Sequence, residues 1–283
     1  MARGGIFWVL GFGGPFAFAL AACVELKAVT ATSHAGESLA TYEEQVGLLD
    51  ETCRFGRVLN GATKCPKDTA KWQRALAMLV AYSKGLDAAA AGKAPSAGDA
   101  VGSALGQAES ANWVSLSTGA QDAVQKVASG VVAFLAREAT RASIQQAIRD
   151  VGPSLDTVVQ LLASHLALEL EYLLGVRCQV ACEAGQPFDT DRCPDTPPQT
   201  CQGRDAARSL WFIEFEERLD AQDAALRRAS AALQAFGKAH KHLYDEVEHL
   251  DADALYKAVV EDITFTVSAV TADGGSTAEG GAP

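Results

Sequence analysis

The sequence predicts an all-α protein, an elongated antiparallel bundle of four or five helices with disulfide-stapled hairpins. Alanine is abundant and aromatic residues make up only 7% of the chain, a composition that favours helix. Apolar residues recur at helical spacing along most of the chain. Cysteines flank two of the expected connections between helices. Strand-like alternation is absent over any useful length, except at 263–270.

Composition narrows the classes of partner. The chain has 283 residues, of which 48% are hydrophobic and 21% charged, and its formal net charge is -11. Such a composition is typical of a packed globular protein. An acidic surface repels phosphate, so nucleic acid is excluded as an expected partner and anionic lipid is not expected to bind the protein surface.

Residues 1–22 have the layout of a signal peptide. Their sequence is MARGGIFWVLGFGGPFAFALAA, in which Arg3 precedes a mostly apolar stretch and small residues follow. A single transmembrane helix is the competing interpretation. The stretch is slightly short for that, and glycines and Pro15 interrupt it.

The next residues indicate how the chain is anchored. Leu20-Ala21-Ala22-Cys23 resembles the lipobox of bacterial lipoproteins, and the resemblance covers residues 1–23 only. It implies that the Cys23 thiol carries diacylglyceryl, that cleavage occurs just before it, and that the new amino terminus is acylated, for example with palmitate. Val24 rather than Asp after the cysteine implies the outer membrane. The alternative is that Cys23 simply follows an Ala-x-Ala cleavage site.

The mature chain divides into three parts. Residues 23–37 are expected to be the lipidated cysteine and a polar tether, 38–265 a helical bundle, and 266–283 a disordered tail. Helices are expected over about 38–59, 67–91, 120–151, 154–183 and 204–263, with a weaker one at 99–112. Gly152-Pro153 is expected to end or kink the third of the main helices.

The last helix carries the clearest pattern, a heptad seam. One series is Phe212, Leu219, Leu226, Leu233, His240 and Val247, and the second is Phe215, Gln222, Ala229, Phe236, Leu243 and Leu250. A straight helix of that length would span about 90 Å. We therefore expect it to bend near Gly237 or to project beyond its neighbours.

Six cysteines remain after Cys23, as expected for disulfides in an exported chain. Hairpin geometry favours the pairs Cys53–Cys65, Cys178–Cys201 and Cys182–Cys193. A zinc site built from the last four cysteines is the alternative. Their spacing, C-x₃-C-x₁₀-C-x₇-C, does not match the usual zinc motifs.

The histidines offer few ligand candidates. His242, Glu246 and His249 share a stripe if the helix continues, which makes them weak metal candidates, although a solvated face with ion pairs is the favoured interpretation. His240 is interpreted as a core or register-setting histidine. His165 and Glu169 are interpreted as a pair on a helix face.

No catalytic motif is recognised, and no cofactor is expected. The expected function is that of a membrane-anchored envelope lipoprotein, a non-catalytic structural or protein-interaction module whose partners are the membrane, through its lipid, and another envelope protein. The aromatic cluster at 211–215 serves core packing, or else receives a partner helix or acyl chain. The alternative function is a periplasmic binding module for a lipid or apolar small molecule. A dry interhelical cavity would favour that alternative, and a filled core with an exposed apolar stripe would favour the first.

Overall fold

The computed structural model describes residues 26–40, 69–94, 116–183 and 206–274. Six α-helices and one 3₁₀-helix lie in these ranges, and no strand occurs among them. The helices pack in pairs along their lengths. The predicted all-α class is therefore confirmed for this part of the chain.

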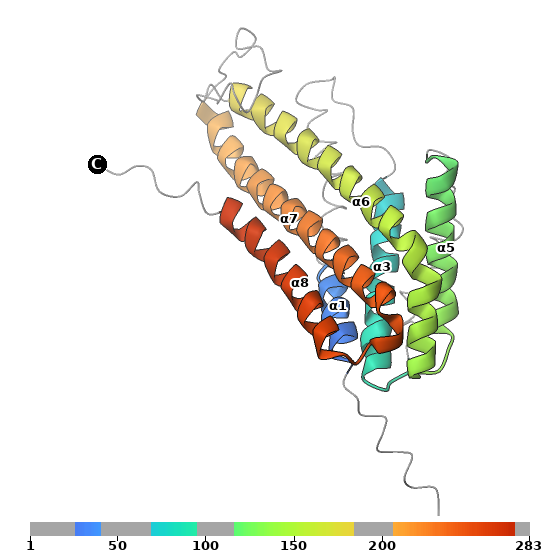
Figure 1. Ribbon diagram of the computed structural model, residues 1–283. Coiled ribbons are helices and arrows are strands. Elements are labelled where there is room, and N and C mark those ends of the chain that lie inside the picture. The colour runs from blue at the N-terminus through green and yellow to red at the C-terminus, as the bar shows by residue number, and fades with distance from the viewer. Residues whose placement is uncertain (1–25, 41–68, 95–115, 184–205, 275–283) are drawn as a thin grey trace, which may run out of the picture.

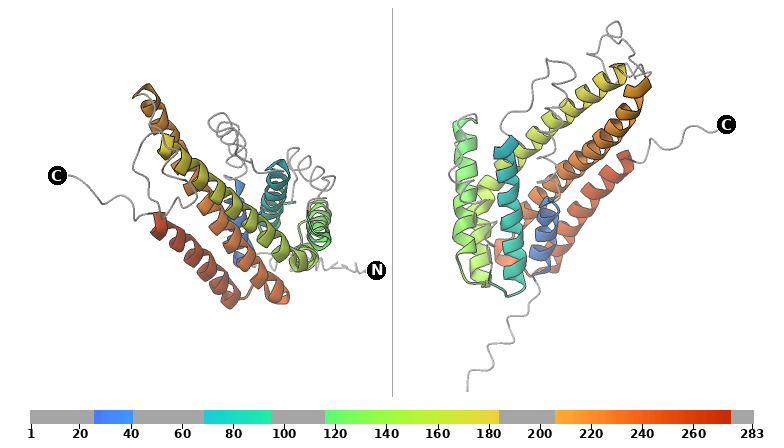
Figure 2. Two further views of the ribbon diagram at one scale, coloured as in Figure 1. Left: turned by 90° about the horizontal axis from the view of Figure 1, so that it is seen from above. Right: turned by 180° about the vertical axis from the view of Figure 1, so that it is seen from behind.

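Two long helices form the backbone of the bundle. They are α6 (Arg141–Glu183) and α7 (Ala206–Asp245), which run antiparallel and pack on one another. The α5 helix (Thr118–Leu135) packs on α6, and α8 (Asp253–Gly274) packs on α7. Figure 1 and the right-hand view of Figure 2 show α6 and α7 extending past α5 and α8 at one end.

The α1 helix (Lys27–Glu37) occupies the segment predicted to be a polar tether, so that prediction is wrong. It packs against α7, α8 and α3 (Thr69–Ala90). The polar residues Thr32 and Ser33 are fully buried, and each hydroxyl donates to a carbonyl one turn back in the same helix, at 2.9 and 2.7 Å. Because these hydroxyls form hydrogen bonds within their own helix, a segment with polar residues can be buried in the core. The helix expected over 38–59 falls mostly outside the described residues, as does the weak one at 99–112.

Apolar side chains from all six described α-helices meet in one continuous core, to which α8 contributes Leu255 and Val259. The largest fully buried residues are Tyr82, Phe134, Phe236, Leu39, Leu76, Met78, Leu79, Leu86, Ile144, Ile148 and Leu155. Buried alanines lie between them and let the helices approach closely.

The helix predicted over 120–151 is instead two helices. α5 ends at Leu135 and α6 begins at Arg141. Thr140 and Ser143 cap the start of α6 reciprocally, because each hydroxyl accepts from the other residue's backbone N–H, at 3.0 and 3.1 Å. This capping box satisfies amides that the helix leaves open, and so stabilises the break.

Pro153 lies inside α6, which continues through it. Gly152-Pro153 was expected either to end or to kink the helix, and the prediction that it ends the helix is therefore wrong. Proline has no N–H to donate to the carbonyl four residues back, and its ring crowds that carbonyl, which bends a helix. Figure 1 shows the ribbon of α6 changing direction along its length.

The prediction of a single helix over 204–263 is also wrong. α7 ends at Asp245, the 3₁₀-helix η4 (Val247–His249) follows, and α8 returns along α7. Leu250 and Leu255 are buried beside this turn. The reversal covers apolar surface of α7 that a projecting helix would leave in water.

The heptad seam is confirmed within α7 for the side chains that the structure describes, whereas Val247 lies in η4 and is half-buried. Its buried members are Leu219, Gln222, Leu226, Ala229, Leu233, Phe236, His240, Leu243 and Leu250. Gly237, the expected bend, lies within α7 beside Val159 of α6. Residues 266–274, expected to begin a disordered tail, continue α8.

Candidate functional site

Most of the predicted site residues lie outside the residues whose side chains are described. These are Cys23, Cys53, Cys65, Cys182, Cys193 and Cys201. Cys178, near the end of α6, is buried and disulfide-bonded. The specific pairing of Cys178 with Cys201 stays a prediction.

The structure separates the weak metal candidates His242, Glu246 and His249. His242 is in α7, Glu246 follows the end of that helix, and His249 is in η4. The ring Nε2 of His242 lies 3.0 Å from a carboxylate oxygen of Asp262 on α8. In the described ranges, no group of three or more His, Cys, Asp or Glu side chains is placed to hold a metal ion.

Three ion pairs instead surround the η4 turn. Arg149 pairs with Glu248, and Arg141 pairs with Asp251 at 2.7 Å. The hydrogen bond from Arg141 lowers the pKa of the Asp251 carboxyl. The third pair is His242 and Asp262, whose side chains lie 3.0 Å apart, and together these contacts join α6 and α8 to the end of α7. This arrangement fits the favoured interpretation, a solvated face with ion pairs.

His240 is a core histidine, as predicted. Its side chain is buried, and Nε2 lies 2.8 Å from the Tyr82 hydroxyl of α3. Burial lowers the pKa of His240 to about 3, so the ring is neutral at physiological pH. Burial, with a smaller contribution from Asp150, raises the pKa of Tyr82. The neutral pair ties α3 to α7 without placing a charge in the core.

His165 and Glu169 form the predicted pair on one face of α6, and both side chains are buried. His165 is 8% exposed and Glu169 is 0% exposed. The His165 Nε2 and Glu169 Oε1 atoms lie 2.6 Å apart. This is ion-pair distance, yet neither atom completes a hydrogen bond of regular geometry. The ring of Trp72 on α3 stacks on His165, with centroids 4.4 Å apart.

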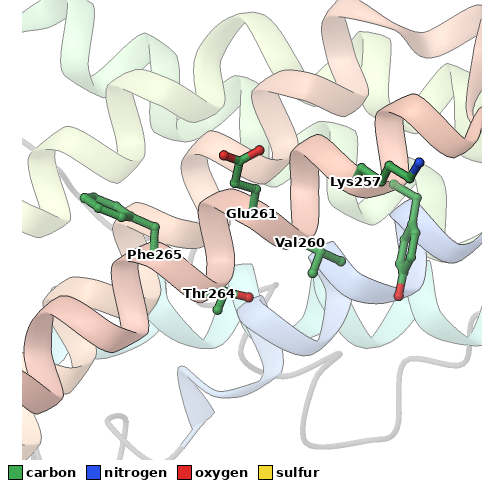
Figure 3. Close-up of a pocket in the computed structure, with 6 residues that line it drawn as sticks. Lys257, Val260, Glu261, Thr264 and Phe265 are labelled. Atoms are coloured by element: carbon green, nitrogen blue, oxygen red, sulfur yellow. The ribbon is translucent and has the colours of Figure 1, made fainter.

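An open groove runs along the outer face of α8 (Figure 3). It has a volume of about 480 Å³ and is lined by Tyr256, Lys257, Val260, Glu261, Thr264 and Phe265. All of these residues belong to α8, so the groove does not lie between helices. Phe265 is 69% exposed, which makes it the most exposed large apolar side chain of the described residues.

One described helix is long and apolar enough to cross a membrane by length and composition alone. It is the stretch Arg141–Cys178 of α6. This stretch packs on α5 and α7, and buried residues such as Ile148 and Leu162 supply its apolar character. About 39% of its most apolar window is buried inside the bundle.

Comparison with known proteins assigns no family. No family model matches the sequence, and neither a curated protein nor a solved structure matches it. Function is therefore inferred from the chain's own residues.

Proposed function

We propose that the mature chain is a lipid-anchored bacterial envelope protein, a non-catalytic structural or protein-interaction module. Its lipid is on Cys23, it resides at the outer membrane, and it faces the periplasm. The observation that carries this proposal is Leu20-Ala21-Ala22-Cys23 at the end of an apolar segment. Each buried CH₂ of the acyl chains contributes about 0.8 kcal/mol, so several chains anchor firmly.

The position of α1 gives the anchor a structural consequence. Only Val24, Glu25 and Leu26 separate Cys23 from Lys27, the first residue of α1. Such a link spans at most about 14 Å. In Figure 1 the start of α1 lies at the same end as the α5–α6 and α7–α8 turns. A lipidated Cys23 would hold that end near the membrane, and the α6–α7 tip would point away.

The cysteines agree with an exported protein. A disulfide at Cys178 fits an oxidising compartment such as the periplasm. We propose the pairs Cys178–Cys201 and Cys182–Cys193 at the α6–α7 tip, and Cys53–Cys65 nearer the amino terminus. Each would add about 2–4 kcal/mol to the free energy of unfolding.

The surface of α8 supports an interaction role over the alternative, a carrier of a lipid or apolar small molecule. Carriers enclose most of their ligand between elements. The apolar groove around Val260 and Phe265 is instead open and belongs to one helix. An exposed apolar strip of this kind suits contact with another protein, such as a second envelope component.

The test is metabolic labelling with palmitate in a Gram-negative host that produces the full chain. We expect the wild type to carry the label and to fractionate with the outer membrane, with an intact mass that includes the lipid. Cys23→Ser should lose the label and become soluble in the periplasm, whereas the matched control Cys178→Ser should keep the label. An unmodified wild-type polypeptide that still begins at Met1 would refute the anchor.

A further inference from the structure

The contact between α1 and the bundle buries small side chains. Within α1 itself the buried residues are Ala28, Val29, Thr32, Ser33, Ala35 and Gly36. Leu26 and Leu39, just outside its two ends, are the large buried side chains of this segment. The equally long stretch 76–86 of α3 buries Leu76, Met78, Leu79, Tyr82 and Leu86. Hydrophobic stabilisation grows with the apolar area removed from water, so α1 gains less from its contact than α3 does.

The buried hydroxyls of this contact are satisfied without a partner on the opposite helix. Thr32 and Ser33 donate to carbonyls of α1, and Ser83 on the facing side of α3 donates to a carbonyl of its own helix at 2.9 Å. Across the contact, His34 Nε2 lies 3.8 Å from Asp87, and both side chains are exposed. Exposed pairs add little stability. The helices can therefore separate without leaving these three hydroxyls unsatisfied, which is the costly outcome when a hydrogen bond across a contact is broken.

The α1 helix depends on its packing for its helical form. It has 11 residues, its N-cap residue Leu26 makes no capping hydrogen bond from a side chain, and its first turn holds no acidic residue. Isolated helices shorter than about 12–15 residues are marginal in water. The right-hand view of Figure 2 shows α1 at an edge of the bundle, between α3 and α8. Once detached from these neighbours, α1 should unwind.

We propose that α1 is a releasable strap, which detaches and unwinds as one local unit while the other helices stay folded. When α1 is docked, the link from Cys23 to Lys27 spans at most about 14 Å. With α1 released, the chain from Cys23 to Ser38 can span about 50 Å. The bundle could then reach a partner farther from the membrane. The release is a property of the bundle, and only its effect on reach rests on the proposed lipid anchor.

Amide hydrogen exchange of the purified full chain tests the release. In the wild type, the amides of 32–36 should exchange at least about 100-fold faster than the core amides around Tyr82 and Phe236. Gly36→Ala, whose Cβ would meet Ser83 and Phe236, should speed exchange in α1 by a further factor of about ten. Exchange in the middle of α6 should change by less than about twofold. Wild-type α1 amides that exchange as slowly as the core would overturn the proposal.

Thiol modification shows whether the whole helix leaves its site. Ser33→Cys places a thiol at a fully buried position of α1, and the matched control Ala147→Cys does so in α6. Without denaturant, a thiol reagent should modify Cys at 33 at least about 100-fold faster than Cys at 147, as mass spectrometry of each site would show. Equal rates would mean that α1 opens only with the whole bundle, which would contradict a strap. If either variant fails to fold, exchange of the wild type decides.

The outcome is distinguishable from that of the lipid anchor. A chain that takes no palmitate but opens at α1 would refute the anchor and keep the release. A labelled chain in which α1 exchanges only with the core would refute the release and keep the anchor.

Discussion

His240 shows how one residue can make the stability of the whole bundle depend on pH. The folded pKa of its ring is about 3, against an ordinary value of 6.5. At pH values between these two pKa values, His240 is protonated in the unfolded chain but not in the folded protein. The free energy of unfolding therefore falls as the pH falls through this window, and the stabilisation is fully present only above about 6.5.

The corresponding prediction compares wild type with His240→Gln, which does not titrate but can still reach the Tyr82 hydroxyl. Between pH 7 and pH 5 the wild type should lose about 2 kcal/mol more stability than the variant. Urea unfolding of both proteins at each pH measures this difference, in which the other titrating groups cancel. Equal losses in the two proteins would show that His240 is not held neutral by the fold.

The histidines also show what residue types alone can and cannot predict. His240 was predicted as a core residue because it occupies a heptad position among apolar neighbours. His165 and Glu169 have the spacing of a common surface ion pair, and this spacing is identical for a buried pair. Only the approach of Trp72 from α3 distinguishes the two cases, and a contact between distant segments leaves no local mark in the sequence.

At the scale of elements, the sequence predicted that helices form, but it placed their ends less well. The 246–252 turn has no Gly or Pro, and the heptad pattern continues across it through Val247 and Leu250. Leu250 is buried after the reversal as it would be in a seam. The apolar pattern therefore fits both a straight helix and a hairpin, and tertiary packing decides between them.

The α1 helix provides an element-scale prediction, because a tether and a packed helix respond differently to Gly36→Ala. A Cβ at Gly36 would lie 1.8 Å from the Ser83 Oγ atom, 2.7 Å from Ser83 Cβ and 2.9 Å from Phe236 Cε2. Rotation of the serine hydroxyl relieves only the first contact. The helices α1, α3 and α7 would have to separate, so we expect a loss of about 1–3 kcal/mol.

Gly175→Ala on α6 is the matched control for this change. Nothing lies within 4 Å of a Cβ at that exposed helical position. Alanine should there stabilise the protein by up to about 1 kcal/mol through helix propensity. Thermal or urea unfolding of both variants measures the contrast. If Gly36→Ala had no effect on stability, α1 would behave as the tether that its composition first suggested.

For the whole molecule, the arrangement of α6 and α7 divides the bundle into a thick end and a two-helix tip. The thick end combines α1, α3, α5 and α8 around the long pair (Figure 1). Beyond the thick end, α6 and α7 pack only on each other among the described helices. Arg177 pairs with Asp220 across that tip at 2.9 Å. Exposed ion pairs of this kind add little stability, so a covalent link near Cys178 has the larger effect.

This division leads to the prediction for the whole molecule. Peptide mapping of the unreduced protein should show Cys178 joined to Cys201 and Cys182 joined to Cys193. Either link closes the α6–α7 connection, and its loss should loosen the tip before it affects the thick end, because fewer buried side chains hold the tip. Hydrogen exchange of Cys178→Ser should therefore rise first in the parts of α6 and α7 near Arg177, while the amides around Tyr82 and Phe134 stay protected. Uniformly faster exchange through both ends would instead indicate one cooperative unit, in which the disulfide stabilises the bundle as a whole.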